Sequence, residues 1–431
     1  NVIYGTELGN GNLVFAISTL DRSPLSGAAF NPSLAPLGIS GFGTSFLAFG
    51  AGSVDSGPYA GSYTPFQNIP DPNCIANKGI LFPQASGSRC GFFYGDRFNV
   101  VNDEDHLKTY TSFQTELSNG RTFKVDYLTS EIDVNDNFQS PSYPALSLAT
   151  PANIIMPGQG GSPFSFPVMF LGRALGSAFD SPAAPRYLEA QRLSLGLSGE
   201  LNNGFDMDIN YTYSAEDNKG YQPDTSTSRF LNAIRGGSGA PGTWNLFDST
   251  SNSQELIDYI GTFQATFVDV KLHVLDFVMT GMVNDVEVAT GFQWRKEHHD
   301  VARNDDSIAG FDANGNLSEP ADLIFLGGGI ETTASRAAYA VFAEAAKQAS
   351  EKVELRGAVR YESLESDSTL NPKVSIRMQA NDNLVLRGSV STSFREPSLS
   401  QLNQSSVGLQ GIQDFDTSCL LYTSPSPRDT M

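Results

Sequence analysis

The residue types that most often carry out chemistry are sparse in this sequence. The chain has 431 residues but only four His, at positions 106, 273, 298 and 299, and three Cys. No Ser/His/Asp or Cys/His arrangement that would support nucleophilic catalysis stands out, and the acidic residues are scattered without a paired motif. We therefore expect no catalytic residue, no resident cofactor and no enzymatic activity.

Two short segments have the composition of metal sites. His298 and His299 lie beside Glu297 and Asp300, but neighbouring side chains of a strand point to opposite faces, so two adjacent imidazoles do not easily hold one ion. The segment Asp312–Asn316 resembles the start of a calcium loop, although its Gly comes too early and the closing Glu is missing. We expect solvated histidines at the base of a loop, a tight turn within a loop, and no metal site.

Two other segments are expected to lie in loops. Gly237–Gly242 matches the pattern G-x-G-x-x-G of phosphate-binding loops, but it neither follows a buried parallel strand nor opens a helix, and it contains Pro241. In Ser251–Phe263 the apolar residues Leu256 and Ile260 have helical spacing. The first segment is predicted to be a flexible loop and the second a short helix within a loop.

Cys74 and Cys90 lie close together in a stretch rich in Gly and Pro. We expect them to form one disulfide, which requires an oxidising compartment such as the periplasm or the cell surface. Two unrelated buried thiols are the alternative. A zinc site is not expected, because no further Cys or His lies near enough in sequence to complete four ligands.

The third cysteine belongs to a segment that we do not expect to be native. Cys419–Asp429 resembles the translation of a transposase sequencing adapter over eleven consecutive residues. The alternative is a natural linker rich in Pro and Ser. We therefore divide the chain into a folded part, residues 1–418, and a non-native tail, residues 419–431.

Composition excludes two classes of protein. The chain has 47 acidic and 27 basic residues and a net charge of −20, so it lacks the basic face with which proteins bind nucleic acid. No apolar run is long enough for a transmembrane helix. The sequence begins at Asn1 without a leader segment, and we expect the natural start to lie upstream.

The elements that position these residues are strands. Apolar residues occupy every second position over 205–213, 353–361 and 384–394, which gives a strand one apolar and one polar face. Short turn signals at 118–120, 202–204, 284–285, 349–351 and 381–383 join pairs of strands, whereas long connections follow Leu20, Val134, Glu216 and Asp300. One end of the sheet is thus expected to carry tight turns and the other large loops.

The length of the strands favours a membrane protein over a soluble sandwich. Several strands run for ten or more residues, longer than is usual in sandwiches and long enough to cross a bilayer at a tilt. Six aromatic residues lie near the long-loop end of their strands, as in a girdle at the lipid headgroups: Tyr211, Tyr213, Phe292, Trp294, Tyr361 and Phe394. The pattern predicts an all-β, antiparallel up-and-down transmembrane β-barrel with long extracellular loops.

Four segments resemble the barrel of TonB-dependent outer-membrane receptors: Val288–Glu297, Ala338–Glu344, Asn371–Val374 and Ser393–Leu399. The resemblance covers residues 285 to 402, and it implies an N-terminal plug inside a barrel of about 22 strands. We count 11 strands from Leu13 to Arg395, with a possible twelfth at Asn1–Tyr4. We therefore expect a partial barrel, with the plug, its energy-coupling box and the rest of the barrel outside this chain.

The same resemblance implies a function in the outer membrane. The expected activity is uptake of a ferric siderophore, cobalamin or an oligosaccharide, energised by the TonB inner-membrane complex acting through the plug. The expected partners are outer-membrane lipid, that complex and the small-molecule or oligosaccharide ligand, whose binding residues the sequence does not identify. The alternatives are a passive porin-like barrel and a secreted soluble β-rich carbohydrate-binding protein, in which the apolar strand faces would close a dry core.

Overall fold

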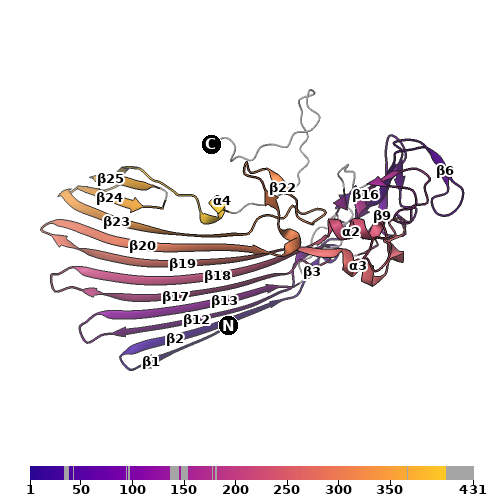
Figure 1. Cartoon of the computed structure of the whole chain (residues 1–431). Coiled ribbons are helices and arrows are strands. Elements are labelled where there is room, and N and C mark those ends of the chain that lie inside the picture. The colour runs from indigo at the N-terminus through magenta and orange to yellow at the C-terminus, as the bar shows by residue number, and fades with distance from the viewer. Residues whose placement is uncertain are drawn as a thin grey trace.

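The structure is a computed structural model that describes residues 1–33, 38–41, 43–93, 95, 98–135, 145–146, 154–176, 178–179, 182–365 and 367–403. Its largest element is an antiparallel sheet of 12 strands, in which each strand pairs with the next strand of the same sheet in chain order. The strands run side by side in a curved sheet (Figure 1). From one edge to the other they are β1 (Val2–Leu8), β2 (Gly11–Arg22), β12 (Glu104–Glu116), β13 (Thr122–Val134), β17 (Arg186–Glu200), β18 (Asp206–Thr225), β19 (Gly261–Val283), β20 (Val286–Arg303), β23 (Thr332–Ser350), β24 (Val353–Ser363), β25 (Ser368–Asn381) and β26 (Leu384–Ser391).

The tight turns lie at one end of this sheet, except for the short connection between β24 and β25 at the opposite end. Gly120 (φ 74°), Gly204 (φ 79°) and Asn284 (φ 57°) adopt positive φ in three of them, a conformation that Gly and Asn tolerate and that short hairpins require. The long connections leave the opposite end (Figure 1). The 12 strands confirm the predicted partial up-and-down barrel with long loops at one end.

Two strand boundaries differ from those expected. The pairing of β18 with β19 continues to Thr225 and Gly261, well past the expected long connection after Glu216. β26 ends at Ser391, so Phe394 and Arg395 lie beyond it. The reason is Pro372 on β25, which would be the next partner and has no N–H group to donate to the ladder.

The long loops fold into small sheets and helices of their own beyond the far end of the barrel sheet (Figure 1). The remaining strands are β3 (Leu25–Ser26), β4 (Ile39–Ser40), β5 (Thr44–Ala48), β6 (Gly52–Val54), β7 (Gly61–Tyr63), β8 (Asn68–Pro70), β9 (Gly79–Pro83), β10 (Ser88–Phe93), β11 (Asn99–Val101), β14 (Ala145–Leu146), β15 (Ile154–Ile155), β16 (Val168–Arg173), β21 (Gly310–Phe311) and β22 (Leu317–Glu319). The helices are α1 (Gly27–Phe30), α2 (Thr227–Ile234), α3 (Gln254–Ile260) and α4 (Leu399–Asn403), with short 3-10 turns η3 (Ser249–Ser251) and η4 (Asp305–Ser307). Helix α3 confirms the short helix predicted within residues 251–263.

The largest buried apolar core lies among these loops and not in the barrel sheet. It combines side chains from three loops, among them Phe46, Phe170 and Trp244, which are 1% exposed or less. We call the loop segments around this core, residues 44–93, 154–175 and 226–260, the external module. Among the described residues, none of the helices is both long and apolar enough to span a bilayer.

Candidate functional site

The apolar positions of neighbouring strands share one face of the barrel sheet. Phe277 on β19 lies directly opposite both Ile209 on β18 and Phe292 on β20. On the same face of the last strands, Val374 is 64% and Val390 81% exposed. Within the described part of the chain this apolar face is therefore not covered by a second layer of protein. This open apolar face is unlike the soluble alternative, in which these side chains would close a dry core.

Aromatic residues form a band on this apolar face. The ladder places Tyr211, Leu275, Trp294 and Tyr339 as successive neighbours on four adjacent strands. Three more aromatic residues lie on the same face, each two positions along its strand from this row: Tyr213, Phe292 and Tyr361. Phe394 is the exception among the six predicted girdle residues, because it lies beyond the end of β26.

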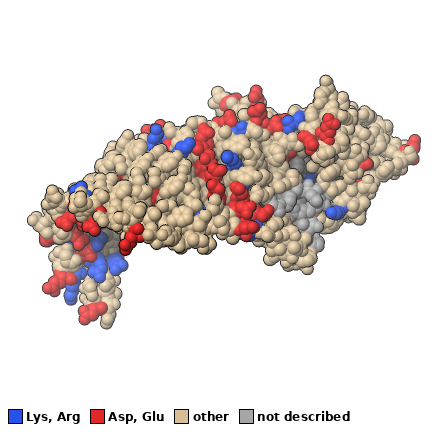
Figure 2. All heavy atoms as spheres, turned by 90° about the horizontal axis from the view of Figure 1, so that it is seen from below, with Lys and Arg blue, Asp and Glu red and all other residues tan. Residues whose placement is uncertain are grey.

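A row of carboxylates lies on the same face, on the long-loop side of the aromatic band. Its members are directly opposite one another on five adjacent strands: Glu131, Glu189, Asp217, Asp269 and Asp300. Lys271 pairs with the row through a contact of 2.8 Å between its Nζ and Asp269 Oδ1. Figure 2 shows a band of surface with few charges that ends at a stripe of acidic side chains.

The apolar band matches the thickness of a membrane. On β18 the apolar face runs from Met207 to Ala215 before it reaches Asp217. From 207 to 215 this stretch is nine residues long, which falls within the roughly 9–11 residues that a tilted strand needs to cross a bilayer. The tight turns and the long loops therefore lie on opposite sides of the bilayer.

The opposite face of the sheet is polar and cross-linked by hydrogen bonds. Gln293 donates to Asp276 Oδ1 (2.7 Å) and accepts from Arg360 Nη2 (2.9 Å). Arg295 Nη1 donates to Glu362 Oε1 at 2.8 Å. These contacts join β19, β20 and β24, passing over β23, so the face that would line the lumen of a barrel is held by hydrogen bonds and an ion pair.

Arg336 on β23 fixes the segment that follows β26 to this polar face. Its guanidinium lies 2.7 Å from Glu297 Oε2 and 3.1 Å from Glu396 Oε2, and it donates to the carbonyl of Pro397 at 2.7 Å. Leu399 of α4 is buried next to these contacts. The short helix α4 is thereby positioned against β20 and β23 on the lumen side.

The external module is held together by packed aromatic rings and a disulfide. Phe247 stacks on Phe46 with ring centroids 4.3 Å apart, and Tyr59 meets the edges of both rings. Burial raises the pKa of the Tyr59 hydroxyl far above its usual value. Cys74 and Cys90 form a disulfide with Cα atoms 5.7 Å apart, in the strand layer next to this core. The loops thus present a preformed surface above the barrel.

Asp224 ties the end of β18 to the loop that contains residues 324–326. Its Oδ2 accepts hydrogen bonds from the backbone N–H groups of Leu326 (2.8 Å) and Phe325 (3.2 Å). Burial raises the pKa of Asp224 to about 6, and these backbone donors oppose the shift only in part. Asp224 lies beyond the carboxylate row, outside the membrane.

Asp322 is a second anchor of the same loop. It accepts hydrogen bonds from the backbone N–H of Ser228 (2.7 Å) and from the hydroxyl groups of Ser228 (2.8 Å) and Ser226. Burial alone would raise the pKa of Asp322, but these donors outweigh it and lower the pKa. The contact joins this loop to the start of α2 in the external module.

The segments singled out from the sequence lie in one barrel strand and in two loops. His298 and His299 lie within β20, not at a loop base, and point to opposite faces; His299 is only 7% exposed, so the prediction that both are solvated was wrong. Gly237–Gly242 lies in the loop between α2 and α3. Asp312–Asn316 forms the predicted tight turn, between β21 and β22, with Asp312 accepting from the N–H of Asn316 at 2.8 Å.

No cluster of three or more His, Cys, Asp or Glu side chains that could hold a metal ion occurs in the described ranges. The adapter-like tail from Cys419 onward lies outside the described residues.

Comparison with known proteins identifies the family of the chain. A sequence model described as "TonB dependent receptor-like, beta-barrel" matches residues 135–425, about two thirds of the chain. No curated protein matches the sequence.

Several solved structures resemble the fold. The FrpB iron transporter of Neisseria meningitidis is 9% identical, with 90% of this chain and 42% of that chain aligned and a TM-score of 0.42. The ferric enterobactin receptor PfeA of Pseudomonas aeruginosa is 10% identical, with 93% and 44% aligned and a TM-score of 0.45. The ferric-catecholate import receptor Fiu of E. coli K12 is 11% identical, with 90% and 50% aligned and a TM-score of 0.41. The chain thus spans half or less of the length of these structures.

The family match agrees with the membrane-facing sheet that the residues build. Proteins of this family are outer-membrane transporters and not enzymes. The chain belongs to the TonB-dependent receptor family, and its 12-stranded sheet is part of the outer-membrane β-barrel of that family.

Proposed function

We propose that this chain supplies part of the wall and the external vestibule of a receptor that takes up a scarce nutrient with energy from the TonB inner-membrane complex. The observation that carries the proposal is the two-faced sheet: one apolar, uncovered face with an aromatic band, and one polar face held by paired charges. Such a sheet fits a barrel wall between lipid and a polar interior.

The external module would form the ligand-binding vestibule. Its aromatic core, its disulfide and the anchors Asp224 and Asp322 preorganise the loops above the sheet. Preorganised loops lose less conformational entropy when they bind a ligand than mobile loops do. We propose a ligand of the size of a ferric siderophore, cobalamin or an oligosaccharide, because such solutes need a wide vestibule.

The two faces of the sheet have different roles in the proposed mechanism. The apolar face holds the wall in lipid, and the polar face contacts a plug domain through which the TonB complex would act. Membership of the TonB-dependent receptor family favours this energised mechanism over a passive porin.

Uptake by the complete receptor tests the proposal. A strain that lacks the gene would be supplied with labelled ferric siderophores, cobalamin and oligosaccharides in turn, with and without a plasmid copy of the gene. We expect one class of solute to enter only when the gene is present, and uptake to stop when a protonophore collapses the proton gradient. Gene-dependent uptake that survives the protonophore would indicate a passive pore and contradict the proposal, as would unchanged uptake of every solute.

A further inference from the structure

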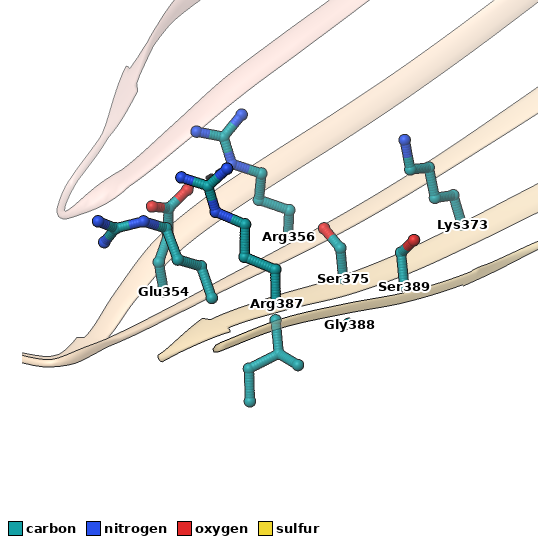
Figure 3. Close-up of a pocket in the computed structure, with 9 residues that line it drawn as sticks. Glu354, Arg356, Lys373, Ser375, Arg387, Gly388 and Ser389 are labelled. Atoms are coloured by element: carbon teal, nitrogen blue, oxygen red, sulfur yellow. Dashed lines mark hydrogen bonds and ion pairs between the residues drawn. The ribbon is translucent and has the colours of Figure 1, made fainter. Parts of the chain in front are cut away.

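A basic groove lies on the polar face at the tight-turn end of the last three strands. It has a volume of about 560 Å³, and its charged and hydroxyl-bearing side chains come from β24, β25 and β26: Glu354, Arg356, Lys373, Ser375, Arg377, Arg387 and Ser389. In Figure 3 the side chains of Arg356, Lys373 and Arg387 rise from the same side of the strands. Four cations thus gather in a protein whose acidic residues outnumber its basic ones by 47 to 27.

Most of these cations lack a partner among the described residues. Arg356 pairs with Glu354. Lys373, Arg377 and Arg387 have no carboxylate within 4.0 Å in the part of the chain that the structure describes. Arg377 and Arg387 are directly opposite each other in the ladder, an arrangement in which like charges destabilise a sheet. Elsewhere on the polar face the structure pairs Arg295, Arg336 and Arg360 with glutamates.

The chemistry of the groove matches an oxyanion. A guanidinium presents a planar fork of N–H donors that fits the two oxygens of a carboxylate or phosphate. The hydroxyl groups of Ser375 and Ser389 lie between the cations and add neutral donors. The volume falls in the range of small-molecule sites.

We propose that this groove is an oxyanion-binding site that takes a carboxylate or phosphate group. The group could be carried by a solute in the lumen or by a carboxylate side chain of the receptor polypeptide outside the groove. The site requires only that β24, β25 and β26 form, so its test is independent of nutrient uptake.

The first experiment titrates pyrophosphate into the complete receptor, purified in detergent at low ionic strength, and follows the heat of binding. If a solute carries the anion, we expect saturable binding that weakens about tenfold or more for each guanidinium removed in Arg377→Gln and Arg387→Gln, as for hydrogen bonds to charged groups. The matched control is Arg192→Gln, which removes a polar-face cation on β17, opposite Ser214, and should leave the affinity unchanged.

The second experiment identifies the other source. A carbodiimide joins Lys373 covalently to any carboxylate in contact with it, and mass spectrometry of the digested receptor locates the joined residue. A link to a carboxylate outside the groove that is lost in the Arg377→Gln/Arg387→Gln variant supports a site filled by the receptor itself, even if pyrophosphate does not bind.

Two outcomes would overturn the proposal. One is the absence of both pyrophosphate binding and a cross-link; the other is pyrophosphate binding that the double variant leaves unchanged. If the double variant does not fold, as judged by its mobility in unheated detergent gels, Lys373→Gln and the charge-preserving Arg377→Lys/Arg387→Lys give the same comparison. The lysine pair keeps the charges but not the planar N–H forks, so it should bind pyrophosphate less tightly than the natural receptor, and Lys373→Gln should also weaken binding.

Discussion

Arg336 on β23 lies directly opposite Glu297 on β20, with its Nη2 2.7 Å from Glu297 Oε2. The Arg336 side chain is 7% exposed, and it also contacts Glu396 and the carbonyl of Pro397. One buried cation therefore joins the wall of the sheet to the segment after its last strand.

Replacing Arg336 by Met should release that segment. Glu297 and Glu396 would remain close together without a cation, and breaking such a buried pair costs about 3–5 kcal/mol. We expect faster protease cleavage within residues 392–403 and a lower thermal unfolding temperature of the complete receptor. Arg336→Lys keeps the positive charge but not the planar guanidinium, so its cleavage rate and unfolding temperature should lie between those of the natural receptor and Arg336→Met. Unchanged cleavage in Arg336→Met would show that α4 is held by other contacts.

The loop anchored by Asp224 should become more stable as the pH falls. Its pKa is raised from 3.8 to about 6 in the folded protein, so folding favours the protonated form. The stabilisation is complete below about pH 4, is lost as the pH rises through 6, and amounts to at most about 3 kcal/mol. Hydrogen exchange at the amides of Phe325 and Leu326, corrected for intrinsic rates, should slow between pH 7 and pH 5. Asp224→Asn should remove this dependence, and a slope that persists in that variant would assign it to another group.

The barrel strands could be predicted from sequence because lipid imposes a strict period of two. In 205–213 the apolar residues alternate without interruption, and a one-residue shift would turn every one of them toward the polar side. The tight turns could also be predicted, since Gly120 and Gly204 supply the positive φ that a hairpin needs.

The parts that the sequence did not reveal lie where that constraint ends. Residues 216–219 of β18 are exposed and residues 223–225 are buried against the loops, so the continuation of the strand to Thr225 shows no alternating pattern. The core of the external module draws Phe46, Phe170 and Phe247 from three separate loops, and no local period marks them. The groove cations Arg377 and Arg387 meet only through the register of two strands.

A charge introduced on the apolar face should destabilise the folded barrel far more than the same charge on the polar face one residue away. Phe277 lies in the apolar band, whereas Val278 points to the polar face, opposite Asp208. Phe277→Arg should destabilise the barrel, by less than the about 2–4 kcal/mol of a charge at the bilayer midplane, and reduce the amount of folded receptor in outer-membrane fractions. Val278→Arg is the matched control and should assemble almost normally. Equal losses for both variants would contradict the assignment of the two faces.

The disulfide should stabilise the external module without affecting the barrel. Cys74 and Cys90 are separated by 16 residues, and closing a loop of that length restricts the unfolded chain by about 3 kcal/mol. The bridge lies near strands β8, β9 and β10 in the long loop between β2 and β12, outside the 12-stranded sheet. We expect Cys74→Ser/Cys90→Ser to increase protease cleavage between residues 68 and 93, while the mobility of the unheated receptor in detergent gels stays that of the folded barrel. A mild reductant should reproduce the effect in the natural protein and have none in the double variant. Loss of the folded-barrel mobility in the double variant would show that the loops and the sheet do not fold independently.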